Sequence, residues 1–317
     1  MNILFLFTPN DRWNEHFQKL KSEFPETEFT AVSDPEGRLE ALKTADAVVS
    51  GRLTESEVNE ALKLKAVIVP FTGLNNFPVD VLERRNILIF NTHANAPFVA
   101  EHAFSLALAL LGRIPEFHDD LKKGIWSRSH ESEDLWTTIR GKTIGIAGLG
   151  HIGLNIAKYA KAFDCKVLGL KRNTEKKKIE NVDELTGDIK YFAETGDVIF
   201  AALPLSDTTK NMFDWNILKE MKGKYLVNVG RGDTVNEEAL YRALKEGILA
   251  GAALDVWYKY PGKNPEPVYP ANLPFWELPN VLFSPHKSSH TPEAVNAMID
   301  DTVNNIRKAV LLLKEQA

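Results

Sequence analysis

The feature that most constrains the fold is a glycine-rich turn between an apolar strand and an amphipathic helix. The expected strand at 143–147 runs into G-L-G-H-I-G, which places Gly148, Gly150 and Gly153 ahead of an expected helix at 153–163. The first glycine permits a tight turn, the second lets the backbone approach a pyrophosphate, and the third lets helix and strand pack closely. The helix N-terminus offers unpaired N–H groups to phosphate. The pattern predicts a dinucleotide-binding α/β unit; a tight turn without a ligand is the alternative.

Two cations follow the next expected strand, at 166–170, where the choice of cofactor is made. A carboxylate is typical about 20 residues after the first glycine, because it accepts hydrogen bonds from a ribose 2′-hydroxyl. Here the chain reads Lys171-Arg172-Asn173. Cations attract a 2′-phosphate, and Arg can bind it bidentately. The sequence therefore predicts that NADP is preferred and NAD is possible, with two merely exposed cations as the alternative.

Short apolar runs alternate with helical patterns along the whole chain, which predicts parallel sheets joined by crossover helices. In the first hundred residues, Thr54 and Glu57 have the spacing of a capping box at a helix start. The expected strands there lie at 3–7, 47–49, 65–69 and 87–90, and the helices at 14–24, 36–45, 54–64 and 78–85.

A second α/β pattern occupies the later part of the chain. The segment 258–274 is expected to be a long surface loop, and 292–314 a helix that folds back on the first domain. The apolar helix at 99–111 is expected between domains or against a second subunit, with a simple core helix as the alternative. Further expected strands lie at 198–202, 225–229, 250–253 and 281–283, and further helices at 214–221 and 236–246.

The bulk composition is that of an ordinary globular protein. The 317 residues carry a net charge of −5, which gives no indication of a nucleic-acid partner. The single cysteine, Cys165, excludes an intrachain disulfide and fits a cytoplasmic protein. No apolar run approaches the length of a membrane span, and no spacing typical of a metal site is present. The expectation is a cytoplasmic protein with no membrane, nucleic-acid or metal partner.

Three later segments at expected strand ends bring chemistry to this edge of the sheet. They read V-N-V-G-R-G at 227–232, A-L-D-V-W at 253–257 and S-P-H-K-S-S-H-T at 284–291. Reduction of a 2-keto acid needs a cation to hold the carboxylate and polarise the ketone, and an acid to protonate the new alkoxide. Arg231 suits the first role because its planar fork matches a carboxylate. His286 suits the second because imidazole titrates near neutral pH.

With these motifs in register, the chain resembles the D-isomer-specific 2-hydroxyacid dehydrogenases. The resemblance extends from F-T-G-L-N-N at Phe71 and N-A-P-F-V-A-E-H at Asn95 to the histidine segment. It implies a Rossmann dinucleotide domain at 99–288, inserted into a flavodoxin-like substrate domain formed by 1–98 and 289–317. It also implies a homodimer.

The resemblance further assigns roles to individual residues. Arg231 and His286 would be catalytic, and Asp255 would hold the carboxamide side of the nicotinamide. The substrate carboxylate would be bound by the backbone N–H groups of Thr72, Gly73 and Leu74, with Asn95 nearby. The full set of candidate cofactor-binding residues is Gly148, Gly150, His151, Ile152, Gly153, Lys171, Arg172, Asn173, Pro204, Val229, Gly230 and Asp255.

One position departs from the family pattern. The family carries a glutamate five residues after the aspartate of A-L-D-V, where it pairs with the catalytic histidine; here that place holds Tyr260. A neutral phenol orients an imidazole but adds little charge stabilisation. The sequence thus predicts that His286 protonates at lower pH than in the family, so that keto-acid reduction weakens toward alkaline pH.

The predicted activity is a hydride transfer between NADP(H) and a small 2-keto or 2-hydroxy acid of the glyoxylate or hydroxypyruvate type. Two alternatives remain open because of Tyr260. One is a formate-type dehydrogenase, which transfers hydride without a proton. The other is a dinucleotide-sensing protein with little catalysis.

Overall fold

The computed structural model describes residues 1–126, 135–172, 178–262 and 266–315. The chain divides into two compact units: unit 1 comprises Met1–Asn95 with His290–Ala317, and unit 2 comprises Ala96–Ser289. The first unit is therefore discontinuous in sequence, and the second is inserted into it.

Unit 1 is built on a five-stranded parallel sheet with the order β2-β1-β3-β4-β5. This is the flavodoxin-like order, as predicted. In register, Ile3 of β1 lies between Phe29 of β2 and Ala47 of β3. The strands are β1 (Asn2–Phe5), β2 (Glu28–Ala31), β3 (Ala47–Val49), β4 (Ala66–Val69) and β5 (Leu88–Asn91), and the helices are α1 (Asp11–Glu23), α2 (Pro35–Leu42), α3 (Glu55–Glu60), α4 (Val79–Arg84) and α11 (Pro292–Glu315).

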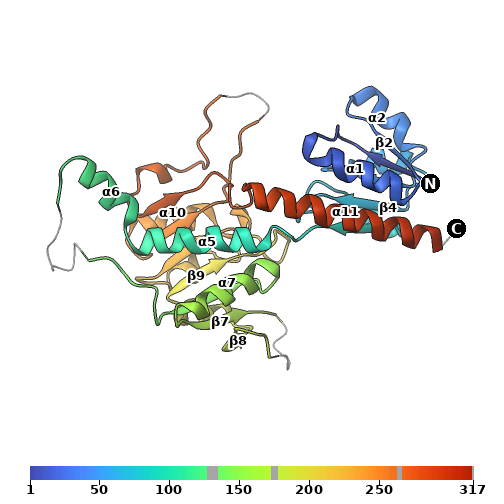
Figure 1. The fold of residues 1–317 in the computed structure, drawn as a ribbon. Helices are drawn as coiled ribbons and strands as arrows, with labels where there is room; N and C mark the ends of the chain where they lie inside the picture. Colours follow the sequence, from blue (N-terminus) through green and yellow to red (C-terminus); the bar gives the residue numbers. More distant parts are fainter. Residues whose placement is uncertain (127–134, 173–177, 263–265, 316–317) are drawn as a thin grey trace. The chain divides into compact units, whose positions relative to one another are not determined.

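Helices cover both faces of this sheet (Figure 1). Successive strand residues point to opposite faces, so Ile3 and Phe5 pack against α1 and α11, whereas Leu4 packs toward α2, α3 and α4. The predicted return of the last helix to the first domain is confirmed, because α11 contributes Ile299, Val303, Ile306, Ala309, Val310 and Leu313 to this core.

Unit 2 is built on a seven-stranded parallel sheet with the order β12-β11-β10-β9-β6-β7-β8. Counted from β6, this is the Rossmann order extended by one strand. The strands are β6 (Thr143–Ala147), β7 (Lys166–Leu170), β8 (Glu184–Thr186), β9 (Val198–Ala201), β10 (Tyr225–Asn228), β11 (Gly251–Leu254) and β12 (Val281–Phe283), and the helices are α5 (Ala96–Leu111), α6 (Ile114–Lys122), α7 (His151–Ala162), α8 (Ile189–Thr195), α9 (Trp215–Leu218) and α10 (Glu237–Lys245).

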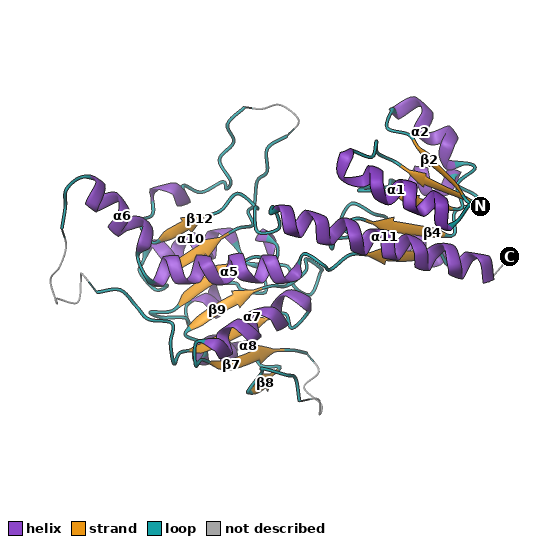
Figure 2. Cartoon of the chain, viewed as in Figure 1, coloured by secondary structure: helices purple, strands orange, loops and turns teal. Residues whose placement is uncertain are grey.

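Helices α5 and α7 lie side by side on one face of this sheet, and α8, α9 and α10 cover the other (Figures 1 and 2). Val99, Ala103 and Phe104 of α5 are buried against strand residues such as Phe200 and Val227. The buried side of α5 is therefore part of the core of unit 2, in agreement with the core-helix alternative. Among the described residues, no single helix is long and apolar enough to span a bilayer; α5 and α6 meet that test only as a pair bent by 57°.

Strands 143–147, 166–170 and 281–283 match their predicted limits. The capping box of Thr54 and Glu57 is confirmed, but the helix that it starts ends at Glu60 rather than Leu64. The chain turns there because Leu64 packs into the core just before β4. The edge strands β2 and β8 and the helices α6 and α8 were not predicted. The described parts of the 258–274 loop, 258–262 and 266–274, contain neither helix nor strand.

Candidate active site

The carboxyl ends of the parallel strands of unit 2 carry the candidate cofactor and catalytic residues to one edge of the sheet. The turn after β6 contains the three glycines, and Lys171 follows β7. Pro204 lies in the segment after β9, Arg231 after β10, Asp255 after β11 and His286 after β12. Residues far apart in the sequence are thereby gathered on one side of unit 2.

The glycine-rich turn has the geometry of a phosphate cradle. Gly148 has φ 98°, and a Cβ there would lie 2.7 Å from the Ala202 carbonyl oxygen. A Cβ on Gly153 would overlap the Gly148 carbonyl, whereas a Cβ on Gly150 would meet no described atom within 4 Å. Gly150 is also the N-cap of α7, and it provides no side-chain capping bond to the first turn of the helix. Open space and uncapped N–H groups thus meet where a pyrophosphate fits.

The turn that carries Arg231 is fixed by its neighbours. Asn228 accepts from the Gly230 N–H at 3.1 Å and donates to the Arg231 carbonyl at 3.1 Å. Thr234 donates its hydroxyl proton to the same carbonyl at 2.7 Å. A Cβ on Gly230 would approach the Leu203 carbonyl oxygen to 2.5 Å, so only glycine allows these segments to pack. Asn228 was not predicted as a site residue, although it stands within the V-N-V-G-R-G motif.

Asp255 is fully buried beneath the His286 turn. Its Oδ1 accepts from the Ser284 hydroxyl and from the Lys287 N–H at 2.9 Å, and its Oδ2 accepts from the Ser288 N–H at 3.3 Å. Burial acts to raise the pKa of Asp255, but the hydrogen bonds from Ser284, Ser288 and Lys287 outweigh it and hold the pKa below its usual range. The carboxylate is therefore charged at neutral pH, and its hydrogen bonds come from the chain itself.

Tyr260 lies beside both candidate catalytic groups. Its ring centroid is 5.6 Å from that of His286, with the planes tilted by 56°. Its hydroxyl accepts from the Trp257 N–H at 3.2 Å. Burial raises the pKa of Tyr260, and the nearby Arg231 guanidinium opposes this without cancelling it, so the phenol is neutral near pH 7. The structure thus places Tyr260 against His286, with the Arg231 guanidinium close enough to oppose the rise in the pKa of the phenol.

The two cations that follow β7 are both exposed. The Lys171 N–H bonds the Thr186 carbonyl at 2.9 Å, which fixes its backbone against β8. Neither Lys171 nor Arg172 forms an ion pair with a residue that the structure describes. Asn173, predicted to share this site, lies outside the described residues.

The candidate substrate-binding residues of unit 1 lie at the ends of β4 and β5. Thr72 donates its hydroxyl to the Thr92 carbonyl at 2.9 Å and lies 3.1 Å from Asn95 Oδ1. Asn91 donates to the Thr72 carbonyl at 2.8 Å. The structure therefore brings Thr72 and Asn95 together. Gly73 and Leu74 continue this loop, and Leu74 packs against the core.

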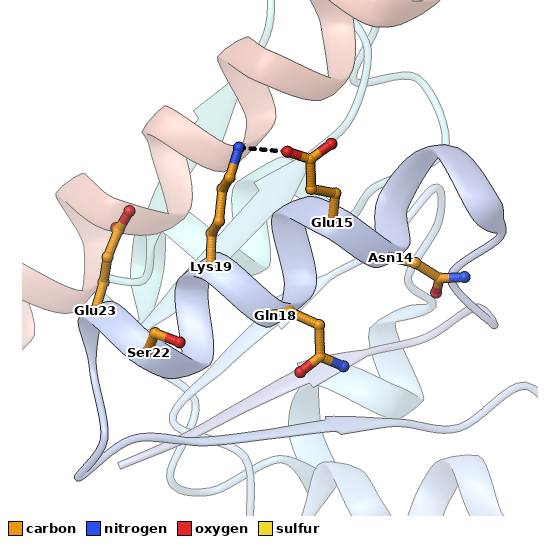
Figure 3. A pocket seen from close by; sticks show the side chains of 6 residues that line it. All are labelled: Asn14, Glu15, Gln18, Lys19, Ser22 and Glu23. Atoms are coloured by element: carbon orange, nitrogen blue, oxygen red, sulfur yellow. Dashed lines mark hydrogen bonds and ion pairs between the residues drawn. The ribbon is translucent and has the colours of Figure 1, made fainter.

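Two other features could form a site, a surface hollow and a group of metal-binding side chains. A hollow of about 530 Å³ on α1 (Figure 3) is lined by polar side chains, among them Lys19, which pairs with Glu15 at 2.6 Å. It contains none of the predicted site residues. Among the described residues, no group of three His, Cys, Asp or Glu side chains is placed to hold a metal ion.

Comparison with known proteins agrees with this geometry. The family model described as D-isomer specific 2-hydroxyacid dehydrogenase, NAD binding domain, matches residues 104–288. The chain belongs to this family. Its predicted family and the two-domain α/β fold are thereby confirmed, and it is an oxidoreductase with a nucleotide-binding domain.

Relatives within the family differ in what their names say they act on. The chain is 33% identical to the D-3-phosphoglycerate dehydrogenase of Methanocaldococcus jannaschii over 95% of its own length but spans only 56% of that protein. It is 33% identical to glyoxylate/hydroxypyruvate reductase B of Serratia proteamaculans, covering 86% of this chain and 83% of the relative. An acyclic imino acid reductase solved with NADPH and D-Arg superposes with a TM-score of 0.82 at 26% identity, covering 98% of both chains.

Proposed function

We propose that this dehydrogenase reduces a small 2-keto acid with NADPH. The observation that carries the proposal is the gathering of Arg231, Tyr260 and His286 on the edge of unit 2 that also holds the glycine-rich turn. Carbonyl reduction requires a cation and a proton donor, and Arg231 and His286 supply these two groups beside the proposed dinucleotide cradle.

The residues would divide the work as follows. When bound, the nicotinamide supplies the hydride to the carbonyl carbon. Arg231 holds the substrate carboxylate and polarises the ketone through paired N–H donors. His286, as imidazolium, gives its proton to the developing alkoxide oxygen and is left neutral. Thr72, Gly73, Leu74 and Asn95 are proposed to bind the substrate carboxylate.

The proposed cofactor site includes Gly148, Gly150, His151, Ile152 and Gly153 for the pyrophosphate. Lys171 and Arg172 would bind the 2′-phosphate through their positive charges. Asn173 is included because it follows them directly in the sequence. The Lys171 and Arg172 side chains are both exposed, which supports their role. NADP is therefore the proposed preference, with NAD as the weaker alternative. The proposed set is completed by Pro204, Val229, Gly230 and Asp255.

The proposed substrate class is glyoxylate or hydroxypyruvate. The name of the Serratia proteamaculans relative supports this class. The decisive assay mixes the purified protein with NADPH and a panel of 2-keto acids and follows absorbance of the nicotinamide. Arg231→Ala and His286→Ala should abolish turnover, whereas Arg140→Ala and His118→Ala, which change the same residue types elsewhere, should not. Turnover that survives both active-site changes would refute the proposal.

Reduction of a 2-imino acid is a second candidate, favoured by the neutral Tyr260 beside His286. A protonated imine already carries its proton, so hydride transfer alone completes the reduction to an amine. The name of one structural neighbour, an acyclic imino acid reductase, supports this candidate. Adding an amine to the keto-acid assay distinguishes the two: imine reduction requires the amine, and keto-acid reduction does not.

Assays on the same purified protein also test the two remaining alternatives, a formate-type dehydrogenase and a dinucleotide sensor. A formate-type enzyme would reduce NAD(P)⁺ with formate and would not need His286 as an acid. A sensor would bind NADPH tightly and turn over none of the acids.

We also propose a homodimer. Unit 2 exposes large apolar side chains around α6, including Ile114, Leu121, Ile125, Trp126 and Trp136, each at least half exposed. Such a patch is typical of a protein interface. Light scattering after gel filtration should give twice the mass of 35.5 kDa, and a monomer would contradict the proposal. A cytoplasmic location remains a prediction from the sequence.

A further inference from the structure

The backbone of His286 adopts a conformation that its side chain disfavours. Its φ of 55° lies in the left-handed region, where a Cβ is crowded. A residue with a Cβ persists there only when its surroundings hold it. The turn around His286 must therefore be fixed from outside, and its contacts show how.

Asp255 binds the turn on both sides of His286. Its carboxylate accepts from the Ser284 hydroxyl on one side and from the N–H groups of Lys287 and Ser288 on the other. Ser284 is further fixed by its N–H, which donates to the Leu254 carbonyl at 2.9 Å, and by its carbonyl, which accepts from Trp257 Nε1 at 2.8 Å.

His102 of helix α5 extends this arrangement. Its Nε2 lies 3.0 Å from the Ser284 hydroxyl oxygen and 3.9 Å from Asp255 Oδ1. Ser284 has one hydroxyl proton, which it donates to Asp255, so its oxygen must accept from His102. His102 therefore carries its proton on Nε2, and a directed chain runs from His102 through Ser284 to the buried carboxylate.

We propose that Asp255, Ser284 and His102 are positioning residues that hold the strained turn presenting His286 to the substrate. The inference rests on the proposed role of His286. In it, Asp255 acts on His286 through the turn, because both of its oxygens accept hydrogen bonds from the segment that flanks His286.

Paired variants of Ser284 and His102 test this proposal. Ser284→Ala removes the hydroxyl and Ser284→Thr keeps it; His102→Leu removes the donor and His102→Gln retains an N–H donor. The two donor-removing variants should lose about 100-fold in kcat, the cost of misplacing a catalytic group by about 1 Å, with KM and the NADPH Kd unchanged. Ser284→Thr and His102→Gln should recover most of the activity. Ser105→Ala, on the exposed side of α5, is the control that should change nothing.

Two results would overturn the proposal. One is equal activity of Ser284→Ala and Ser284→Thr. The other is a loss of NADPH affinity at unchanged kcat, which would place these residues in direct contact with the cofactor. Thermal unfolding of each variant identifies any that fails to fold, and in that event the His102 pair decides.

A measurement without turnover separates this proposal from the proposed function. In histidine ¹⁵N-labelled protein, His102 should give the Nε2-protonated tautomer, and Ser284→Ala should alter the ring signals of His286, assigned by their absence in His286→Asn. If these changes occur in a protein that reduces no acid, the proposed function fails while the anchored turn stands. If the protein reduces keto acids but Ser284→Ala leaves the His286 signals unchanged, the anchored turn fails.

Discussion

Tyr260 and His286 face each other with ring centroids 5.6 Å apart. The phenol is neutral near pH 7, so it orients the imidazole without stabilising the imidazolium as a carboxylate would. This relationship sets the expected pH dependence of the enzyme.

Reduction requires the imidazolium, so the rate should fall as pH rises through the imidazole range of about 6 to 9. Tyr260→Glu places a carboxylate beside the ring and should move the midpoint of the kcat/KM profile upward by about one pH unit or more. Tyr260→Phe is the matched control and should leave the midpoint near that of the wild type. A flat wild-type profile over this range would contradict the prediction.

The glycines at 150 and 153 should respond to alanine in opposite ways. Gly150→Ala has room within the protein, so unfolding should be unchanged, but the added methyl occupies the phosphate cradle and should weaken binding of both NADPH and NADH. Gly153→Ala collides with the Gly148 carbonyl and should lower the free energy of unfolding by about 1–3 kcal/mol. Calorimetry with each nucleotide, together with denaturant unfolding, checks both. Unimpaired nucleotide binding by Gly150→Ala would place the pyrophosphate elsewhere.

Lys171→Ala and Arg172→Ala should each weaken NADPH binding about tenfold, because each removes one charge-assisted contact to the 2′-phosphate. NADH has no such phosphate, so its Kd should stay the same. Raising the salt concentration should reduce the NADPH advantage of the wild type, since exposed charges are screened. Equal losses for the two nucleotides would show that these cations do not read the 2′-phosphate.

The Asp255 carboxylate makes stability depend on pH. Its folded pKa lies below the unfolded value, so its contribution is present above about pH 4 and is lost as pH falls through the folded pKa. Asp255→Asn should cost about 2–3 kcal/mol of unfolding free energy at pH 7, because buried donors lose a charged acceptor. The difference from the wild type should begin to shrink below about pH 4, the unfolded value, and should disappear only below the folded pKa, where both side chains are neutral. Urea unfolding at pH 7 and pH 3 measures it, and an equal difference at both pH values would contradict the prediction.

Tyr258 offers a smaller test near the same loop. Its hydroxyl donates to the Val235 carbonyl at 3.1 Å, and burial strongly raises the pKa of this phenol. Tyr258→Phe should cost about 1 kcal/mol of stability near neutral pH while leaving kcat unchanged. A loss of kcat would place Tyr258 in the catalytic machinery.

Local patterns were sufficient to predict much of the fold. Strands β6 and β7 are largely apolar runs buried on both faces, so their positions could be predicted. The glycines between β6 and α7 marked the turn that joins this strand to this helix. The edge strands β2 and β8 were missed because they pair on one side only and are partly exposed, so neither forms a continuous apolar run.

Some residues of the candidate site could likewise be predicted from sequence, and others could not. Arg231 and His286 stand in short motifs, so sequence alone pointed to them. His102 also ends the motif N-A-P-F-V-A-E-H, but its role could not be assigned from sequence. Its partner Ser284 is 182 residues away, and the contact exists only once α5 packs on the sheet. The conformation of His286 could not be predicted from sequence either, since its left-handed backbone depends on hydrogen bonds that the neighbouring residues donate to Asp255.

Helix α11 has a consequence for biosynthesis. Unit 1 needs the apolar side of this helix to cover one face of its sheet, yet α11 leaves the ribosome only after all of unit 2 has been made. The inserted unit can therefore finish folding first. Until then, Ile3 and Phe5 of β1 lack the helix that covers their face of the sheet. The nascent chain must keep that strand from pairing wrongly until its last helix arrives.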